Sequence, residues 1–353
     1  IYHRLGDKYK AYKHYQRAIK INPEVQTAQN DKAFEYELID ETEETDIMGE
    51  VTDNRIEELQ KDIRRLEQLI LRHEELSSTT QQLTQQTSEL PAEPVFPPKK
   101  DKTIFITGAT SGIGRATAEL FAQNGYRLIL NGRREERLQY MKEEYVEKFQ
   151  ADVHLLPFDV RDVEAVQVAI DSLQDEWRQV DILLNNAGLA SGLAPIHEGD
   201  LEDWETMIDT NVKGLLYMTR AISPYMVERQ EGHIINICST AGKEVYPKGN
   251  VYNASKFAVD ALTKAMRIDL HSYNIRVSQV APGHVEETEF ARVRFHGDEE
   301  KAKIYEDFQP LKAKDVAEVI YFIVTRPGHV NIEDVLMMGT QQASNIFIDR
   351  SGR

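Results

Sequence analysis

The stretch that decides the fold reads TGATSGIG and runs from Thr107 to Gly114. An apolar run over 103–107 ends where this stretch begins, and a helical pattern starts at Arg115. A strand, a glycine-rich turn and a helix in this order open a βαβ unit. The glycines let the backbone turn tightly and approach a pyrophosphate at the amino end of the helix. The stretch therefore predicts a pyrophosphate-binding loop.

The rest of the chain after this loop repeats the same alternation. Short β-branched runs alternate with helical stretches, and buried parallel strands separated by helices need a sheet covered on both faces. The predicted strands are 103–107, 127–131, 153–158, 181–185, 233–238 and 276–281. The sequence thus predicts an α/β fold of the Rossmann type, a doubly wound parallel sheet, preceded by an α-helical N-terminal segment.

Composition limits the possible functions. The chain has 353 residues and a net charge of −17, which argues against nucleic acid and anionic membranes as general partners. No apolar run approaches the ~18 residues of a membrane-spanning helix. The one cysteine, Cys238, excludes an intrachain disulfide and a cysteine-based zinc site, and it fits a reducing compartment, so we expect a cytoplasmic protein. The ten histidines show no i, i+4 pair, and we expect no metal site.

The first helical segment, 1–23, has small and aromatic residues on one face. It resembles the second helix of a tetratricopeptide repeat, and a single amphipathic surface helix is the alternative. The matching positions are Gly6, Ala11, Tyr15, Ala18 and Pro23. Half a repeat cannot bury its own face, so we expect upstream repeats, a longer natural chain before Ile1 and a protein partner for this segment.

Three further segments precede the α/β domain. Residues 24–52 form an acidic linker without Lys or Arg between 33 and 52, and 77–101 form a polar and proline-rich linker. Between them, 53–76 predicts a short coiled-coil-like helix, or a helix packed on its own domain. Its apolar seam is Ile56, Leu59, Ile63, Leu66 and Ile70.

The order of motifs from the glycine loop onward resembles the short-chain dehydrogenase/reductase family. The loop has the spacing G-x-x-x-G-x-G rather than G-x-G-x-x-G. The resemblance covers 102–353 and implies a Rossmann-fold oxidoreductase that uses a nicotinamide cofactor. The other matching elements, in chain order, are Asn185-Asn186-Ala187-Gly188, Asn211, Ser239, Tyr252, Lys256 and Pro282-Gly283.

The expected catalytic residues are Asn211, Ser239, Tyr252 and Lys256. Tyr252 and Lys256 are i and i+4 on one helix face, and an ammonium close to a phenol lowers the pKa of that phenol. Tyr252 is thus the expected general acid/base, a role worth roughly 10²–10⁴ in rate. Ser239 would bond the same substrate oxygen. The resemblance implies that Asn211 holds a water in a proton relay with Lys256.

The end of the second predicted strand indicates the cofactor. Arg133 and Arg134 stand where an NAD-preferring enzyme has an acidic residue, and the first carboxylate is Glu135. Two arginines favour NADP, whose 2′-phosphate they would bind, and make NAD the less favoured cofactor. Ordinary surface arginines are the alternative, since Thr110 and Ser111 lack the basic side chain that many NADP-binding members have.

The expected cofactor-binding set combines the motif residues with those that the resemblance implies. Lys256 is expected at the nicotinamide ribose and Asp159 at the adenine ring. The full set is Gly108, Thr110, Ser111, Gly112, Ile113, Gly114, Arg133, Arg134, Asp159, Val160, Asn186, Ala187, Gly188, Tyr252, Lys256, Pro282, Gly283 and Val285.

The segment after Pro282 and the C-terminal region resemble the branch of NADP-dependent 3-hydroxy acid dehydrogenases. That branch implies a substrate such as serine, allo-threonine or a 3-hydroxyisobutyrate-like acid. A carboxylate needs a cation, and Arg294 or Arg292 is the candidate; a surface or interface arginine is the alternative. Ser239, Tyr252 and Arg294 then form the substrate set.

Two other functions stay open at this point. One is an NADPH-dependent reductase of other aldehydes or ketones. The other is a scaffold protein whose repeats bind a partner and whose enzyme fold is vestigial; the complete catalytic set argues against it. The resemblance also implies a homotetramer.

Overall fold

The computed structural model describes residues 61, 64–65, 68–69, 71–72, 102–303 and 307–351. The chain divides into two units, Ile1–Glu93 and Pro94–Arg353. The repeat-like helix over 1–23, the acidic linker and the proline-rich linker lie outside the described residues, and so does the predicted apolar seam. The described residues between 61 and 72 are helical with exposed side chains, which agrees with a helix there and leaves the coiled coil a prediction.

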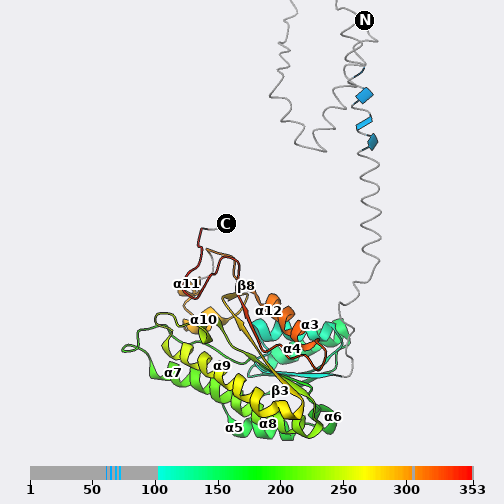
Figure 1. Cartoon of the computed structure of the whole chain (residues 1–353), viewed down its shortest axis with the longest axis vertical. Coiled ribbons are helices and arrows are strands. Elements are labelled where there is room, and N and C mark those ends of the chain that lie inside the picture. The colour runs from blue at the N-terminus through cyan, green and yellow to red at the C-terminus, as the bar shows by residue number, and fades with distance from the viewer. Residues whose placement is uncertain are drawn as a thin grey trace, which may run out of the picture. The chain divides into compact units, whose positions relative to one another are not determined.

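The second unit contains a sheet of seven parallel strands in the order β3-β2-β1-β4-β5-β6-β9 (Figure 1). All six predicted strands are present, and the predicted Rossmann-type fold is confirmed. The strands are β1 (Thr103–Ile106), β2 (Arg127–Gly132), β3 (Val153–Pro157), β4 (Ile182–Asn185), β5 (Gly232–Ile237), β6 (Ile275–Pro282) and β9 (Asp334–Met337).

The seventh strand, β9, was not predicted. It pairs in parallel with β6, with Val280 opposite Val335. Its residues alternate between exposed and half-buried, because it lies at the edge of the sheet and one side of it has no neighbouring strand. Four residues without a buried apolar run give no local strand signal, and the pairing with β6 defines this element.

Helices cover both faces of the sheet (Figure 1). On one face lie α3 (Gly112–Gln123), α4 (Glu135–Phe149) and α12 (Ala313–Val324), and on the other lie α5 (Val163–Asp171), α8 (Leu215–Arg229) and α9 (Asn250–Leu270). The remaining helical elements on this side are α6 (Asp175–Arg178), α7 (Leu201–Ile208) and the π-helical turn Asp209–Gly214.

Two hydrophobic cores result, one on each face of the sheet. Successive residues of a strand point to opposite faces. Ile104 and Ile106 of β1 therefore belong to the core under α3 and α12, and Phe105 belongs to the core under α8 and α9. This is why the strands read as continuous apolar runs.

The segment between β6 and α12 closes over the carboxyl ends of the strands. It contains β7 (Val285–Glu286), α10 (Phe290–Arg294), α11 (Glu299–Ala302) and β8 (Leu311–Lys312), and β7 pairs with β8. In open α/β sheets, ligands bind at the carboxyl ends where the strand order reverses, which here is beside β1 and β4. The segment 285–297 thus covers the expected ligand site.

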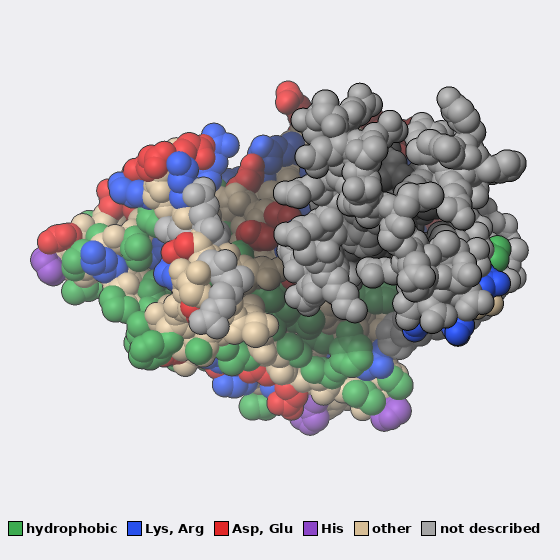
Figure 2. All heavy atoms as spheres, turned by 90° about the horizontal axis from the view of Figure 1, so that it is seen from above, with side chains coloured by type: hydrophobic (Ala, Val, Ile, Leu, Met, Phe, Trp, Pro, Cys, Tyr) green, Lys and Arg blue, Asp and Glu red, His purple; other side chains and the backbone are tan. Residues whose placement is uncertain are grey.

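The described surface carries mixed charge. On the face shown in Figure 2, acidic side chains lie next to basic ones. In the described part of the chain, no helix combines the length and apolar character needed to cross a bilayer.

Candidate active site

A cavity of about 370 Å³ lies at the carboxyl ends of β1, β4, β5 and β6. Two of the residues expected in the site, Gly114 and Asn211, do not line it, and all the others do. Those that line it are Gly108, Thr110, Ser111, Gly112, Ile113, Arg133, Arg134, Asp159, Val160, Asn186, Ala187, Gly188, Ser239, Tyr252, Lys256, Pro282, Gly283, Val285 and Arg294. The fold thus brings motifs from across the domain to one cavity.

The glycine loop forms one end of the cavity. Gly108 and Gly112 have φ angles of +64° and +51°, in the left-handed region that favours glycine. A Cβ added at Gly108 would lie 2.9 Å from the Cα of Ala187. Gly114 lies behind the loop, where an added Cβ would be 2.5 Å from the carbonyl oxygen of Gly108, so it permits close packing of α3. The result is a cradle of bare backbone at a helix amino end, which fits a pyrophosphate.

Tyr252 and Lys256 lie in the first half of α9, and both are buried. Lys256 Nζ donates a hydrogen bond to the carbonyl oxygen of Ile237 at 2.9 Å. It lies 6.0 Å from the centroid of the Tyr252 ring. Burial lowers the pKa of Lys256. The lysine therefore contacts the end of β5 rather than the phenol.

The phenol of Tyr252 has a pKa raised well above its ordinary value, because it is buried away from water. A hydrogen bond from Ser239 and the charge of Arg294 act in the opposite direction but are weaker. The structure corrects the expectation that Lys256 lowers this pKa: spacing of i, i+4 places two side chains on one face without fixing where their polar ends point.

Ser239 follows β5 and begins the 3₁₀ turn Thr240–Gly242. Its Oγ accepts a hydrogen bond from the amide of Ala241 at 3.1 Å. Because it lines the cavity within hydrogen-bonding reach of Tyr252, one substrate oxygen can contact both hydroxyl groups.

Asn211 is buried in the π-helical turn between α7 and α8. Its Nδ2 donates to the carbonyl oxygen of Leu189 at 2.8 Å and to Ser255 Oγ at 3.0 Å, and its Oδ1 accepts from the amide of Leu189. A Cβ on Gly188 would lie 3.2 Å from Asn211 Oδ1 and 3.4 Å from Lys256 Nζ. Asn211 thus links three segments beside Lys256, and its part in a proton relay stays a prediction.

The arginines at the end of β2 line the cavity, but they are not equivalent. Arg133 is exposed, and its nearest carboxylate is Asp159 at 3.7 Å. Arg134 donates to Thr110 Oγ1 at 2.8 and 3.2 Å and forms an ion pair of 2.6 Å with Glu289. The sequence interpretation missed Glu289, which lies 155 positions after Arg134. No local pattern could have indicated this pair.

Glu289 also forms an ion pair of 2.9 Å with Arg137 on α4. Burial raises the pKa of Glu289, and hydrogen bonds from Arg134 and Arg137 lower it more, so the net direction is downward. The carboxylate is therefore charged at neutral pH.

Arg294 is buried at the opposite end of the cavity. Its Nε donates to the carbonyl oxygen of Gly192 at 3.3 Å. Burial raises the pKa of the neighbouring Tyr246 phenol, and the charge of Arg294 and a hydrogen bond from it act in the opposite direction but are weaker. The guanidinium lies 5.4 Å from the ring centroid of Tyr246 and 5.8 Å from that of Tyr252. A buried guanidinium that lines the cavity beside Tyr252 is suited to bind an anionic group.

The other candidate, Arg292, points away from the cavity lining. It pairs with Glu299 at 3.2 Å, and both side chains are exposed. The sequence did not decide which of the two arginines would bind a substrate carboxylate, and the geometry favours Arg294. Tyr246, which packs against Arg294, lines the cavity and was missed because a lone tyrosine in a loop carries no signal.

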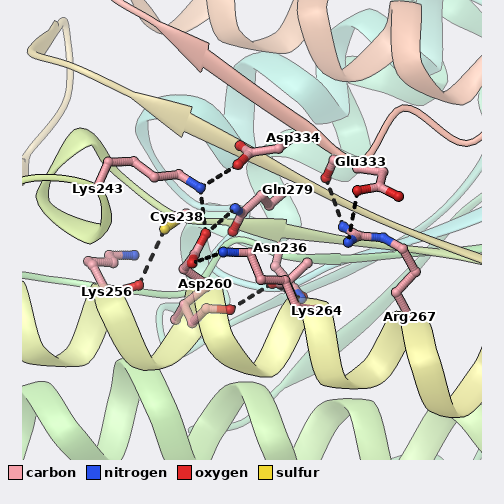
Figure 3. A network of polar contacts seen from close by, with 12 residues as sticks. Asn236, Cys238, Lys243, Lys256, Asp260, Lys264, Arg267, Gln279, Glu333 and Asp334 are labelled. Atoms are coloured by element: carbon pink, nitrogen blue, oxygen red, sulfur yellow. Dashed lines mark hydrogen bonds and ion pairs between the residues drawn. The ribbon is translucent and has the colours of Figure 1, made fainter.

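A polar network supports the site from behind (Figure 3). Lys243, in the loop after Ser239, forms ion pairs with Asp260 of α9 and Asp334 of β9. Asp260 also accepts hydrogen bonds of 2.6 Å from Lys264 and Gln279. The network joins the catalytic loop, α9 and the last two strands of the sheet. Among the described residues, no group of three or more His, Cys, Asp or Glu side chains is placed to hold a metal ion.

Comparisons with known proteins agree with this geometry. Residues 102–299 match the model of the short chain dehydrogenase family. The NADP-dependent 3-hydroxy acid dehydrogenase YdfG of Salmonella typhi is 49% identical over 250 residues, 70% of this chain and 99% of that protein. Sulfoacetaldehyde reductase 2 of Chromohalobacter salexigens is 48% identical over 250 residues, 70% and 98% of the two chains.

A solved structure, the closed form of serine dehydrogenase complexed with NADP⁺, has a TM-score of 0.65 and 47% sequence identity to this chain. The similarity covers 68% of this chain and 96% of that one.

Proposed function

The chain belongs to the short-chain dehydrogenase family, and from that premise we propose that it transfers a hydride between NADP and a small 3-hydroxy acid. The substrates we expect are serine, allo-threonine or a 3-hydroxyisobutyrate-like acid. One observation carries the proposal: the guanidinium of Arg294, a buried residue that lines the cavity, lies 5.8 Å from the ring centroid of Tyr252.

The cofactor is NADP. We infer that the glycine cradle would hold the pyrophosphate and that Arg133 and Arg134, which line the cavity, would bind the 2′-phosphate. The names of the related 3-hydroxy acid dehydrogenase and of the related solved structure include NADP. When bound, the cofactor supplies the hydride acceptor or donor. Gly108, Gly112 and the amino end of α3 would hold its pyrophosphate.

Tyr252 carries the proton at the substrate oxygen. In the direction of reduction, the protonated phenol donates to the carbonyl oxygen as the oxygen gains negative charge. In the direction of oxidation, the phenolate accepts the proton of the substrate hydroxyl. Ser239 donates to the same oxygen and orients it.

Lys256 and Asn211 support this proton transfer from behind. Lys256 Nζ keeps donors free beyond its bond to Ile237. We propose that these donors contact the nicotinamide ribose, with Asn211 and a water completing the relay.

Arg294 holds the negative group of the substrate. A hydrogen bond to a charged group is worth about 1.5–3 kcal/mol, and a buried guanidinium left without an anion is costly. An anionic substrate thus gains affinity at this end of the cavity, while the reacting carbon lies toward Tyr252.

A second candidate function is the reduction of a small sulfonated aldehyde. The 48% identity to a sulfoacetaldehyde reductase favours it. A sulfonate presents acceptor oxygens to Arg294 as a carboxylate does. Both candidates therefore share the cation and differ in the anion.

A substrate screen on the full chain tests the proposal. With NADP⁺ we expect oxidation of L-serine, L-allo-threonine or 3-hydroxyisobutyrate, and turnover of isethionate instead would favour the second candidate. Arg294→Gln should raise KM for the anionic substrate about 10- to 150-fold, since it removes a charge-assisted bond. Arg292→Gln is the matched control and should change KM less than twofold. No turnover of any panel member would support the vestigial-scaffold alternative.

We also propose a cytoplasmic homotetramer. A protein partner for the N-terminal segment remains an expectation, because that segment lies outside the described residues.

A further inference from the structure

The segment 288–294 bridges the two ends of the cavity. At the cofactor end, a Cβ on Gly112 would lie 2.9 Å from Cγ2 of Thr288, so this residue covers the glycine loop. In the middle, the ring of Phe290 packs edge-on against Tyr252, with 5.7 Å between centroids. At the substrate end, the backbone of Arg294 accepts a hydrogen bond from Gly192 at 2.9 Å. Both ends of α10 are therefore anchored to the rest of the domain.

The anchor at the cofactor end is the carboxylate of Glu289. It bonds Arg134 and Arg137 at 2.6 and 2.9 Å. Arg134 is one of the two arginines placed for the cofactor 2′-phosphate, and Glu289 lines the same cavity. Glu289 thus pairs with the same arginine that the NADP assignment gives to the 2′-phosphate.

We propose that Glu289 is a specificity and positioning residue that competes with the 2′-phosphate of NADP for Arg134. The proposal rests on the NADP assignment above. When the phosphate takes Arg134, α10 loses the shorter of the two ion pairs that anchor its cofactor end. Recognition of the 2′-phosphate is thereby coupled to the placement of Phe290 and Arg294.

Charge makes this exchange favourable. A phosphate group carries ≈ −1.5 to −2 charge at neutral pH, more than the single charge of Glu289, and it presents more acceptor oxygens to the arginines. A carboxylate and a phosphate side by side repel each other.

Exposure makes the exchange easy. The side chains of Arg134, Arg137 and Glu289 are 40%, 49% and 32% exposed. Half-exposed ion pairs contribute little to stability, so the existing pairs can be replaced without a large cost.

Binding of cofactor fragments tests the competition without turnover. The probes are adenosine 2′,5′-bisphosphate and adenosine 5′-monophosphate, measured by calorimetry on the full chain. Glu289→Gln should tighten the bisphosphate about tenfold, which corresponds to about 1.4 kcal/mol, and change the monophosphate less than twofold. The matched control is Glu287→Gln. This substitution also removes one negative charge from the segment 285–297, but Glu287 pairs with Lys312 and not with an arginine of the cavity. It should change neither affinity by more than twofold.

The outcomes separate this inference from the proposed function. If the unmodified protein binds both probes equally, the NADP assignment fails. If it prefers the bisphosphate, but Glu289→Gln binds it no more tightly than the unmodified protein does, only the competition is refuted.

Amide hydrogen exchange of 285–297 tests the coupling to α10. In the unmodified protein, adenosine 2′,5′-bisphosphate should speed exchange in this segment at least threefold, and the monophosphate should not. Glu289→Gln should exchange at the faster rate without any ligand. Slower exchange with the bisphosphate would overturn the coupling, because it would mean that the phosphate and Glu289 share Arg134.

Discussion

Tyr252 has an unusual environment for a general base, because its phenol is buried and its pKa is raised. The protonated phenol is ready to donate a proton, whereas oxidation needs the phenolate. We therefore expect kcat/KM for oxidation to rise with pH through the neutral and alkaline range. The reductive reaction should stay constant and fall only at high pH. Initial rates of oxidation and of reduction between pH 6 and 10 measure whether kcat/KM rises or stays constant with pH in each direction.

Substitution of the same residue assigns this profile to Tyr252. Tyr252→Phe should lower turnover by at least 10²-fold and leave the affinity for NADP within about twofold, because only one hydroxyl is removed. Lys256→Ala should damage both, since Lys256 is expected to contact the cofactor. Retention of activity within tenfold in Tyr252→Phe would refute the acid/base assignment.

Arg133 is the more accessible of the two arginines at the cofactor end. It is 62% exposed and has only a distant carboxylate at 3.7 Å, whereas Arg134 is held by Glu289 and Thr110. We expect kcat/KM to favour NADP over NAD by one to two orders of magnitude, about 1.4–2.8 kcal/mol. Arg133→Ala should remove most of this preference by weakening NADP, with NAD little changed. Equal kcat/KM for the two cofactors in the unmodified enzyme would show that these arginines do not bind the phosphate.

At the scale of elements, Asp260 fastens α9 to the catalytic loop and the sheet edge. Burial raises the pKa of Asp260, but hydrogen bonds from Lys243, Lys264 and Gln279 lower it by more than burial raises it. The resulting pKa is about 2. A carboxylate with a depressed pKa stabilises the fold above its unfolded pKa and loses that contribution as pH falls through the folded value.

Asp260→Asn should therefore lower the free energy of unfolding by about 2 kcal/mol at pH 7. The difference should shrink below pH 4 and vanish near pH 2. Urea unfolding of both proteins from pH 7 to pH 3 measures it. Asp175→Asn is the control, because Asp175 is fully exposed and its partner Arg178 lies 3.5 Å away. It should leave the free energy of unfolding nearly unchanged at every pH. A pH-independent difference for Asp260→Asn would mean a packing effect.

At the scale of the whole molecule, the enzyme motifs all lie in the second unit, Pro94–Arg353. We expect the fragment 99–353 to fold and to keep kcat within about twofold of the full chain.

Apolar side chains exposed on α8 and α9 are available for association: Leu216, Phe257 and Ile268 are 38%, 41% and 71% exposed. Light scattering of the fragment should therefore give a tetramer mass. An inactive or insoluble fragment would contradict the expectation that 99–353 folds and works alone. A monomer mass at micromolar concentration would contradict the tetramer.

The sequence by itself determined the fold class, six of the seven strands of the main sheet and most of the expected residues that line the cavity. Six strands were readable because each is buried on both faces and therefore continuously apolar. The glycines of 107–114 were readable because the close approach of Gly108 to Ala187 excludes a side chain. Both requirements act on consecutive residues of one segment. They therefore leave a pattern in the sequence of that segment, even where the contacting residue, such as Ala187, lies far away in the chain.

Only the tertiary structure decided how the charged groups of the site are used. It brought Arg294 and not Arg292 to the cavity, turned Lys256 toward Ile237 instead of the phenol, and paired Arg134 with Glu289. It also made β9 a strand by pairing it with β6. Each of these depends on where a polar end or a backbone edge meets a partner far away in the chain. Sequence spacing cannot contain that information, because it fixes the face on which a side chain lies and not the group that it meets.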